Sequence, residues 1–345
     1  MANSLTTTQI SPPLTQFNTS VLNLATNQSI SSPNIQFIYN PAKAVIYAVV
    51  LSIFSMISIP LNLFNLITLY RNPILHNMNN LLIGNLALVD FLNGLIVLPL
   101  IILTSLIGYP GHFICQLQGF FVLMLYLASL SSTSAISVDR FYAVIKPFRY
   151  SSIITPKKCI IITLYIWLIP LIFGITPTLG LQKYGLGRYF LLYFCAISFE
   201  KFQENYLIHA LLMFYIIIIM FPLLYLLLLY VISLFFMIAY QKSAQDLARG
   251  NLKKSIRTTS MIIGTNLVCW LPYVIIGIRS VAYINRDVVP VYRPTFANII
   301  SVILIFSNSA INPVIYATTN SFIRKRFCGL LHSNRIQPWT SATPR

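Results

Sequence analysis

Seven long apolar runs, separated by short polar segments, dominate the pattern of this chain. They cover roughly residues 44–70, 79–107, 113–145, 158–179, 205–239, 256–283 and 295–317. Each run is long enough to cross a hydrocarbon core of about 30 Å as a helix. Six of the runs contain a proline, at positions 60, 99, 170, 222, 272 and 313, which membrane bundles tolerate. The pattern predicts an all-α membrane protein, a bundle of seven transmembrane helices.

Composition supports this class and argues against a nucleic-acid-binding protein. Hydrophobic residues make up 57% of the chain and charged residues 8%, whereas a soluble domain carries about 25% charged residues. The net charge of +17 comes from short basic clusters between the apolar runs. With the N-terminus outside, 16 of the 23 lysines and arginines lie on the inner side and 7 on the outer side, as the positive-inside rule describes. We expect the lipid bilayer, and no nucleic acid, as a partner.

The N-terminal segment is predicted to be an extracellular, disordered and glycosylated tail. Residues 1–42 carry no charge and are rich in Ser, Thr, Asn and Gln, and they show no cleavable signal pattern. Asn18 and Asn27 are glycosylation acceptors by their triplets, a modification that requires exposure outside the cell. Such triplets also arise by chance in a tail of this composition, so the use of either site stays open.

The rest of the chain divides into a bundle and a short inner extension. The bundle is predicted over 43–318. Residues 319–331 place apolar side chains on one helical face and basic ones on the other, which is typical of an amphipathic helix on the inner leaflet. Residues 332–345 form a short cytoplasmic tail. Cys328 is a predicted palmitoylation site, and the alternative is a free cysteine.

The third run is predicted to be a buried central helix. Cys115 and Arg140 are 25 residues apart, about 37 Å along a helix at about 1.5 Å per residue. One helix can therefore carry a cysteine at the outer face and the Asp139–Arg140 pair at the inner face. Its middle is rich in small polar residues, which allow close approach and inter-helix hydrogen bonds. They are Ser129, Ser131, Ser132, Thr133 and Ser134.

The five cysteines divide by their position in this topology. Cys115 and Cys195 are predicted near the outer face, where an oxidising environment favours a disulfide bond between them. Cys159 and Cys269 fall inside apolar runs and are expected to be packing residues. A β-prone stretch within 188–198 predicts a hairpin that covers the outer mouth of the bundle.

Asp90 is a carboxylate in the middle of the second run. A charge at this depth is costly in a bilayer, and it indicates a functional site by default. The alternative is a purely structural buried hydrogen bond.

Taken together, these residues resemble the rhodopsin-like (class A) G-protein-coupled receptors over about residues 43–331. The resemblance rests on motifs that occur in order on the expected helices. They are Leu61-Asn62, Leu86-Ala87-x-x-Asp90, Asp139-Arg140-Phe141, Trp167, Pro222 with Tyr230, Cys269-Trp270-Leu271-Pro272 and Asn312-Pro313-x-x-Tyr316. Asn266 departs from the family, which usually has Phe at this position.

The resemblance implies a multi-pass plasma-membrane receptor that binds an extracellular ligand, activates a heterotrimeric G protein and is no enzyme. Arrestin is a further implied partner. The implied G-protein switch consists of Asp139, Arg140, Phe141, Tyr230, Asn312, Pro313 and Tyr316. The implied ligand pocket consists of Val122, Tyr126, Trp270, Tyr273 and Phe306. No cofactor is expected, except for sodium in the core, held by Asp90, Ser129, Asn308 and Asn312; the alternative is a water cluster.

Other functions have weaker support in the sequence. A transporter is disfavoured because we find no internal repeat. An enzyme is disfavoured because no HExxH, GxSxG or paired intramembrane acids occur. A peptide, as for a neuropeptide receptor, is the preferred ligand class because the outer loops are long and aromatic-rich. A small-molecule or lipid ligand stays open. Val122 stands where family members for amines usually carry an aspartate.

The inner end of the sixth run is unusual. Residues 250–257 contain three basic residues and no acid, although many family members pair the third-helix arginine with an acid there. Arg140 would then be restrained mainly by its neighbour Asp139. We therefore expect measurable signalling without ligand.

Overall fold

The computed structural model describes the greater part of the bundle. The described residues are 41–72, 78–107, 111–146, 149–180, 188–191, 194–198, 260–262, 264–273, 275–276, 296–319, 323–324 and 326. The fifth predicted run, most of the predicted amphipathic helix and both terminal tails lie outside them.

Five helices in the described part are long and apolar enough to cross a membrane. They correspond to the first four predicted runs and the seventh, so the predicted all-α membrane fold is confirmed. Their segments are α2 (Pro41–Tyr70), α3 (Met78–Leu92) continued by a π-turn η2 (Asn93–Val97) and α4 (Leu98–Ile107), α5 (Gly111–Ile145), α7 (Pro156–Ile175) continued by η4 (Thr176–Leu179), and α10 (Phe296–Thr319). In the sixth run, residues 260–262, 264–273 and 275–276 are helical.

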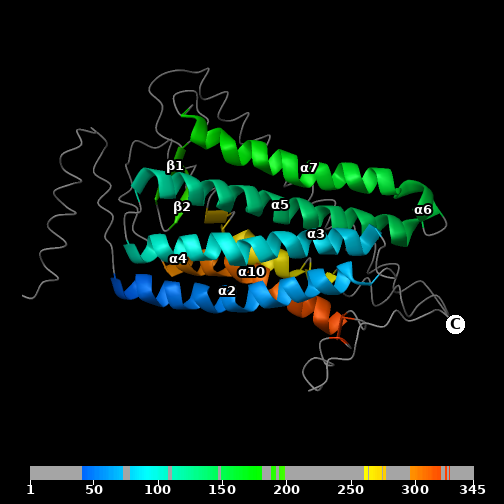
Figure 1. Ribbon diagram of the computed structural model, residues 1–345, viewed down its shortest axis with the longest axis horizontal. Coiled ribbons are helices and arrows are strands. Elements are labelled where there is room, and N and C mark those ends of the chain that lie inside the picture. The colour runs from blue at the N-terminus through cyan, green and yellow to red at the C-terminus, as the bar shows by residue number, and fades with distance from the viewer. Residues whose placement is uncertain are drawn as a thin grey trace, which may run out of the picture. The chain divides into compact units, whose positions relative to one another are not determined.

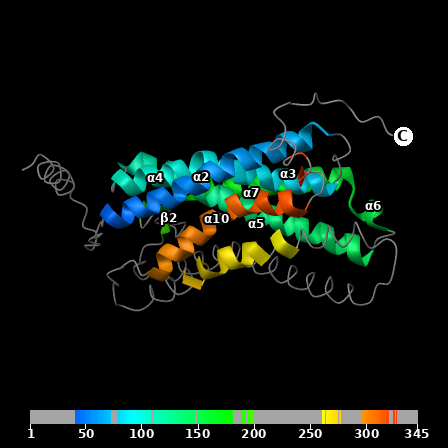
Figure 2. The same cartoon turned by 90° about the horizontal axis from the view of Figure 1, so that it is seen from below.

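The helix α5 holds the central place that its small polar residues predicted. It packs against α3, α4 and α7 and against both strands of the hairpin. Figure 1 shows α5 running between α3 and α7, and α2 packs against α3, α4 and α10. Figure 2 shows the helical part of residues 260–276 beside α10.

The outward faces of these helices remain strongly apolar. Met56 on α2 is 74% exposed, Ile161 on α7 is 64% exposed, and Val268 is 66% exposed. Contiguous apolar exposure of this kind is rare on a soluble protein, and here it is the surface that faces lipid. The polar side chains are buried between the helices instead, which is where a bilayer forces them to find partners.

A π-turn interrupts the second span just before a proline. Pro99 lacks the N–H that a regular α-helix would bond to an earlier carbonyl, and the wider turn η2 precedes it. Gly94 in this turn lies against α2, because a Cβ there would come within 3.1 Å of Ser58 and Ile59. Ser55 also donates a hydrogen bond to the Gly94 carbonyl oxygen at 2.8 Å. The turn therefore docks the second span closely onto the first.

The predicted hairpin and its disulfide bond are both present. β1 (Arg188–Leu191) and β2 (Cys195–Ser198) pair antiparallel, with Leu191 opposite Cys195. Cys195 is bonded to Cys115 at the start of α5, and its N–H donates to Oε1 of Gln118 at 3.4 Å. The hairpin is thus fixed to α5 at one end of the bundle. Cys159 and Cys269 are free and buried, as predicted.

Candidate functional site

The core of the bundle contains a polar network that joins α2, α3 and α10. The hydroxyl of Ser58 donates to the carbonyl oxygen of Asp90 at 3.0 Å and lies 3.1 Å from that of Ser309. The amide of Asn62 donates to Ser309 O at 3.0 Å and to Ser58 O at 2.9 Å. Ser58 and Asn62 are four residues apart and therefore share one helix face. One face of α2 thus fixes the register of two other helices.

Asp90 is joined directly to the Asn312-Pro313-x-x-Tyr316 motif of the last helix. Nδ2 of Asn312 donates to Oδ2 of Asp90 at 2.8 Å, and both residues are buried. The other oxygen, Oδ1 of Asp90, is buried without a hydrogen-bond partner among the described residues. The same holds for Oγ of Ser129 and Oδ1 of Asn308 and of Asn312. Four predicted sodium ligands therefore each present an oxygen with unused bonding capacity.

Asn266 extends this network to the sixth run. Its Nδ2 donates to Ile262 O at 2.8 Å, and its Oδ1 accepts from Nδ2 of Asn308 at 3.0 Å. A phenylalanine, the usual family residue, has no group to make these bonds. The departure seen in the sequence thus replaces an apolar contact with a polar tie to α10.

A second polar junction connects α3, α5 and α7. Nε1 of Trp167 donates to Oδ1 of Asn85 at 2.7 Å, and Nδ2 of Asn85 donates to Oγ of Ser132 at 2.8 Å. Within the described part of the chain, Ser132 is the residue of the 129–134 stretch whose hydroxyl bonds to another helix. Thr133 and Ser134 bond back to carbonyls one turn earlier on α5. Small size, more than inter-helix bonding, therefore explains most of this polar stretch.

Aromatic side chains gather below the hairpin. The ring centroids of Tyr126 and Trp270 are 3.8 Å apart, and those of Tyr126 and Tyr273 are 6.5 Å apart. Phe194, in the turn between the strands, contacts Phe306 of α10 edge-on at 5.7 Å. The structure thus brings three predicted pocket residues into one cluster and links a fourth to the hairpin. Val122, the fifth, is partly buried against the same core.

At the cytoplasmic end of α5, Asp139 and Arg140 form the predicted ion pair. Nε of Arg140 donates to Oδ2 of Asp139 at 2.9 Å, and NH2 of the same guanidinium also contacts that oxygen. Asp139 is 2% exposed and Arg140 is 9% exposed. The pair is therefore largely sheltered from water.

Tyr150 is a third member of this group. Its hydroxyl donates to Oδ1 of Asp139 at 2.6 Å. Burial, together with the hydrogen bond to Asp139, raises the pKa of the Tyr150 phenol above its ordinary value, so it remains a protonated donor at neutral pH. Tyr150 opens the single-turn helix α6 (Tyr150–Ile153), and Nζ of Lys158 at the start of α7 donates to Ile153 O at 2.8 Å.

Several predicted site residues are not joined by the described structure. Tyr316 is buried, and its hydroxyl has no hydrogen-bond partner among the described residues. Pro313 lies inside α10. Phe141 lies in α5, and its side chain is outside the described part. Tyr230, the glycosylation acceptors Asn18 and Asn27, and Cys328 also lie outside the described residues, so their roles stay predictions.

The sequence reasoning missed three functional candidates. They are Ser58, Tyr150, and Asn85, the hydrogen-bond partner of Trp167. Ser58 had a usable signal, because it stands one helical turn before Asn62. Tyr150 had no such signal, because hydrophobic periodicity does not indicate the path of the segment between α5 and α7.

Comparison with known proteins identifies the class. The family model described as 7 transmembrane receptor (rhodopsin family) matches residues 61–316. Adenosine receptor A2b of Gallus gallus is 27% identical over 296 residues, which cover 79% of this chain and 84% of the relative. Histamine H2 receptor of Rattus norvegicus is 28% identical, covering 84% of this chain and 80% of the relative. The QRFP-like peptide receptor of Branchiostoma floridae is 25% identical, covering 80% and 75%.

These relatives are named for different ligands, so the likeness gives the class of protein and leaves the ligand open. The match covers the Asp139–Arg140 pair, Asp90 and the Asn312–Tyr316 motif together. The chain therefore belongs to the rhodopsin family of seven-transmembrane receptors, and it is a multi-pass plasma-membrane receptor, no enzyme, that binds an extracellular ligand and acts on a G protein.

Proposed function

We propose that the ligand of this receptor is a peptide. The observation that carries the proposal is the two-stranded hairpin fixed over the aromatic cluster. In the described part of the chain, β1 and β2 pair only with each other. The N–H of Cys195 on β2 is already bonded to Gln118, so the outer edge of β1 is the one that offers backbone N–H and C=O groups to a further strand. An extended peptide recognises such an edge by main-chain hydrogen bonds. The disulfide bond to Cys115 holds this edge in place before binding.

The chemistry below the hairpin favours a peptide over an amine. Asp90 and Asp139 are the acidic residues of the described part; one is bonded to Asn312 in the core, and the other lies at the cytoplasmic end. An ammonium buried near Val122 would find no carboxylate among the described residues there, at a cost of several kcal/mol. Aromatic residues such as Tyr126 and Trp270 suit the apolar and aromatic side chains of a peptide.

The test is a screen of peptide, lipid and amine libraries on cells that express the full-length receptor, read out as G-protein nucleotide exchange. We expect a response to a peptide and none to biogenic amines at micromolar concentration. A reproducible, blockable response to an amine or a lipid, without any peptide response, would reject this ligand class while leaving the receptor class intact.

Variants of the aromatic cluster locate the response. Tyr126→Ala should weaken the potency of the active peptide about tenfold or more, as the loss of a buried aromatic contact typically does. Tyr165→Ala removes the same group from the lipid-facing side of α7, where Tyr165 is exposed, and should leave potency unchanged. Equal potency for both variants would place the peptide elsewhere.

We also propose that the core binds sodium in the inactive receptor. The support is the set of buried oxygens on Asp90, Ser129, Asn308 and Asn312, each without a described hydrogen-bond partner. One carboxylate with neutral oxygens suits a small hard cation. When bound, the ion would supply a positive charge that neutralises Asp90. Arrestin, the second cytoplasmic partner implied by the resemblance, stays a prediction.

Sodium dependence of agonist affinity tests this site. Raising sodium at constant ionic strength should lower agonist affinity in the natural receptor, and Asp90→Asn should abolish the dependence. Ser105→Ala on α4, whose hydroxyl bonds only within its own helix, is the matched control and should keep it. A dependence that persists in Asp90→Asn would exclude Asp90 as the anchor, and the absence of any dependence in the natural receptor would leave a water cluster as the better account.

A further inference from the structure

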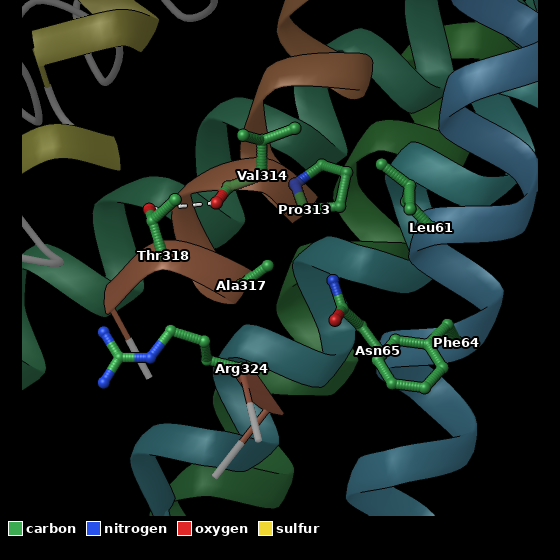
Figure 3. Close-up of a pocket in the computed structure, with 8 residues that line it drawn as sticks. All are labelled: Leu61, Phe64, Asn65, Pro313, Val314, Ala317, Thr318 and Arg324. Atoms are coloured by element: carbon green, nitrogen blue, oxygen red, sulfur yellow. Dashed lines mark hydrogen bonds between the residues drawn. The ribbon is translucent and has the colours of Figure 1, made fainter. Parts of the chain in front are cut away.

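A groove with a volume of about 240 Å³ lies between the cytoplasmic halves of α2 and α10. None of the switch contacts described above runs through it. Figure 3 shows its lining from three segments of the chain. The lining residues are Leu61, Phe64 and Asn65 of α2, Pro313, Val314, Ala317 and Thr318 of α10, and Arg324 beyond α10.

Most of this lining is hydrocarbon and continues into the lipid-facing surface. Val314 is 46% exposed, and Leu63, next to the groove residue Phe64, is also exposed. Both belong to faces that contact acyl chains in a bilayer. An apolar groove that opens onto lipid is filled most favourably by an acyl chain, because water there would have no partners.

One polar group inside the groove lacks a partner. Asn65 is 1% exposed, and its Nδ2 has no hydrogen-bond partner among the described residues. The hydroxyl of Thr318 donates back to the carbonyl oxygens of Val314 and Ile315 at 3.0 Å each, and it does not accept a hydrogen bond from Asn65 in the described structure. In Figure 3 the Asn65 amide points from α2 toward α10. A buried donor without a partner is costly, so the groove presents an N–H to an incoming acceptor.

A positive charge stands at the end of the groove. Arg324 is exposed, and neither acid of the described part pairs with it, since Asp90 bonds Asn312 and Asp139 bonds Arg140. By topology this end of α10 lies at the inner leaflet, whose surface is negative because it contains anionic lipids. A guanidinium suits a phosphate group in both charge and geometry.

We propose that this groove binds one anionic phospholipid of the inner leaflet. An acyl chain lies between α2 and α10, the phosphate is held by Arg324, and an ester or phosphate oxygen accepts a hydrogen bond from Nδ2 of Asn65. Pro313 and Val314 directly follow Asn312, which is bonded to Asp90. A lipid bound here would therefore connect the composition of the inner leaflet to the position of the switch helix α10.

Native mass spectrometry of the purified full-length receptor tests this site, with phosphatidylserine and phosphatidylcholine as the two probes. The natural receptor should retain one phosphatidylserine in preference to phosphatidylcholine. Arg324→Ala should lower phosphatidylserine affinity about fivefold, the usual effect of one basic residue near an anionic surface. Ala317→Phe fills the groove and should lower the binding of both lipids. Neither change removes a buried polar contact, so both variants should fold.

Lys157→Ala is the matched control. It removes an exposed positive charge from the start of α7, a helix that packs against α5 and α3, and should leave phosphatidylserine retention unchanged. Equal retention of both lipids by the natural receptor, an equal loss in Lys157→Ala, or unchanged retention in Ala317→Phe would each overturn the proposal. So would a receptor dimer that disappears in Ala317→Phe, because a second copy would then occupy the groove.

Discussion

The core network and the cytoplasmic end of α5 are held by contacts of very different range. Ser58 in the core bonds to the carbonyl oxygens of Asp90 and Ser309, which are 32 and 251 positions away in the sequence. At the cytoplasmic end, Asp139 bonds to Arg140 and Tyr150, which are one and 11 positions away. The first set joins three helices, whereas the second joins α5 to the short segment that follows it.

This difference indicates how the bundle can change conformation while its helices stay packed together. Long-range bonds fix the register of α2, α3 and α10, and breaking any of them leaves a buried polar group without a partner. Short-range bonds at the end of α5 can be exchanged without moving a neighbouring helix. We therefore expect Arg140 to be released when its contact with Asp139 is lost, while the core keeps the helices aligned.

The largest effect, on stability, is expected from removing a hydrogen bond of the core network. Asn312→Leu removes the hydrogen bond to Asp90 and leaves a buried carboxylate unpaired, which should cost about 3 kcal/mol of stability. We expect a clearly lower thermal unfolding temperature for the purified receptor in nanodiscs. Ile300→Ala, an exposed position on the same helix, is the control and should change little. Equal unfolding temperatures for Asn312→Leu and the natural receptor would show that this bond does not hold the helices.

A smaller effect, on signalling more than on stability, is expected at the cytoplasmic end. Asp139→Asn keeps the shape and the acceptor for Tyr150 but removes the negative charge beside Arg140. We expect ligand-free nucleotide exchange to rise about tenfold, which corresponds to about 1.4 kcal/mol. The unfolding temperature should fall less than in Asn312→Leu, because the Asn side chain still offers an acceptor to Arg140 and Tyr150. A large loss of stability without a gain in nucleotide exchange would show that the cytoplasmic end of α5 behaves like the core network.

The smallest effect is expected for Tyr150→Phe, which removes one hydroxyl. A single hydrogen bond of ordinary strength corresponds to about a threefold rise in ligand-free exchange. Tyr165→Phe, at an exposed position on α7, removes a hydroxyl elsewhere and should have no effect. A fall in exchange for Tyr150→Phe would mean that Tyr150 supports the active arrangement instead.

The sequence allowed most of the fold to be predicted, because a bilayer imposes strong rules on composition and length. The described spans begin and end within a few residues of the predicted runs, and the Cys115–Cys195 bond and the hairpin followed from topology. The π-turn at Asn93–Val97 did not follow. A proline indicates a local irregularity, but the packing of Gly94 against Ser58 decides its form.

The candidate site was predictable where a motif marks it and unpredictable where packing decides it. The motifs gave Asp90, Arg140 and Asn312 directly. The hydrogen bond from Tyr150 to Asp139 depends on how the segment after α5 folds back. The position of Tyr150 in the sequence does not indicate that path. Likewise, the hydrogen bond between Asn85 and Trp167 depends on the packing of α3 against α7. The two residues are 82 positions apart in the sequence.

A double-mutant cycle tests most directly whether Arg140 is held by local contacts that run through Asp139. Ligand-free nucleotide exchange is measured for Asp139→Ala, for Tyr150→Phe and for both together, at equal surface expression. If Tyr150 acts by fixing Asp139, its removal adds nothing once the carboxylate is gone, and the double variant matches Asp139→Ala alone. If the two effects multiply, so that Tyr150→Phe still raises exchange about threefold without Asp139, Tyr150 acts elsewhere and the local lock described here is contradicted.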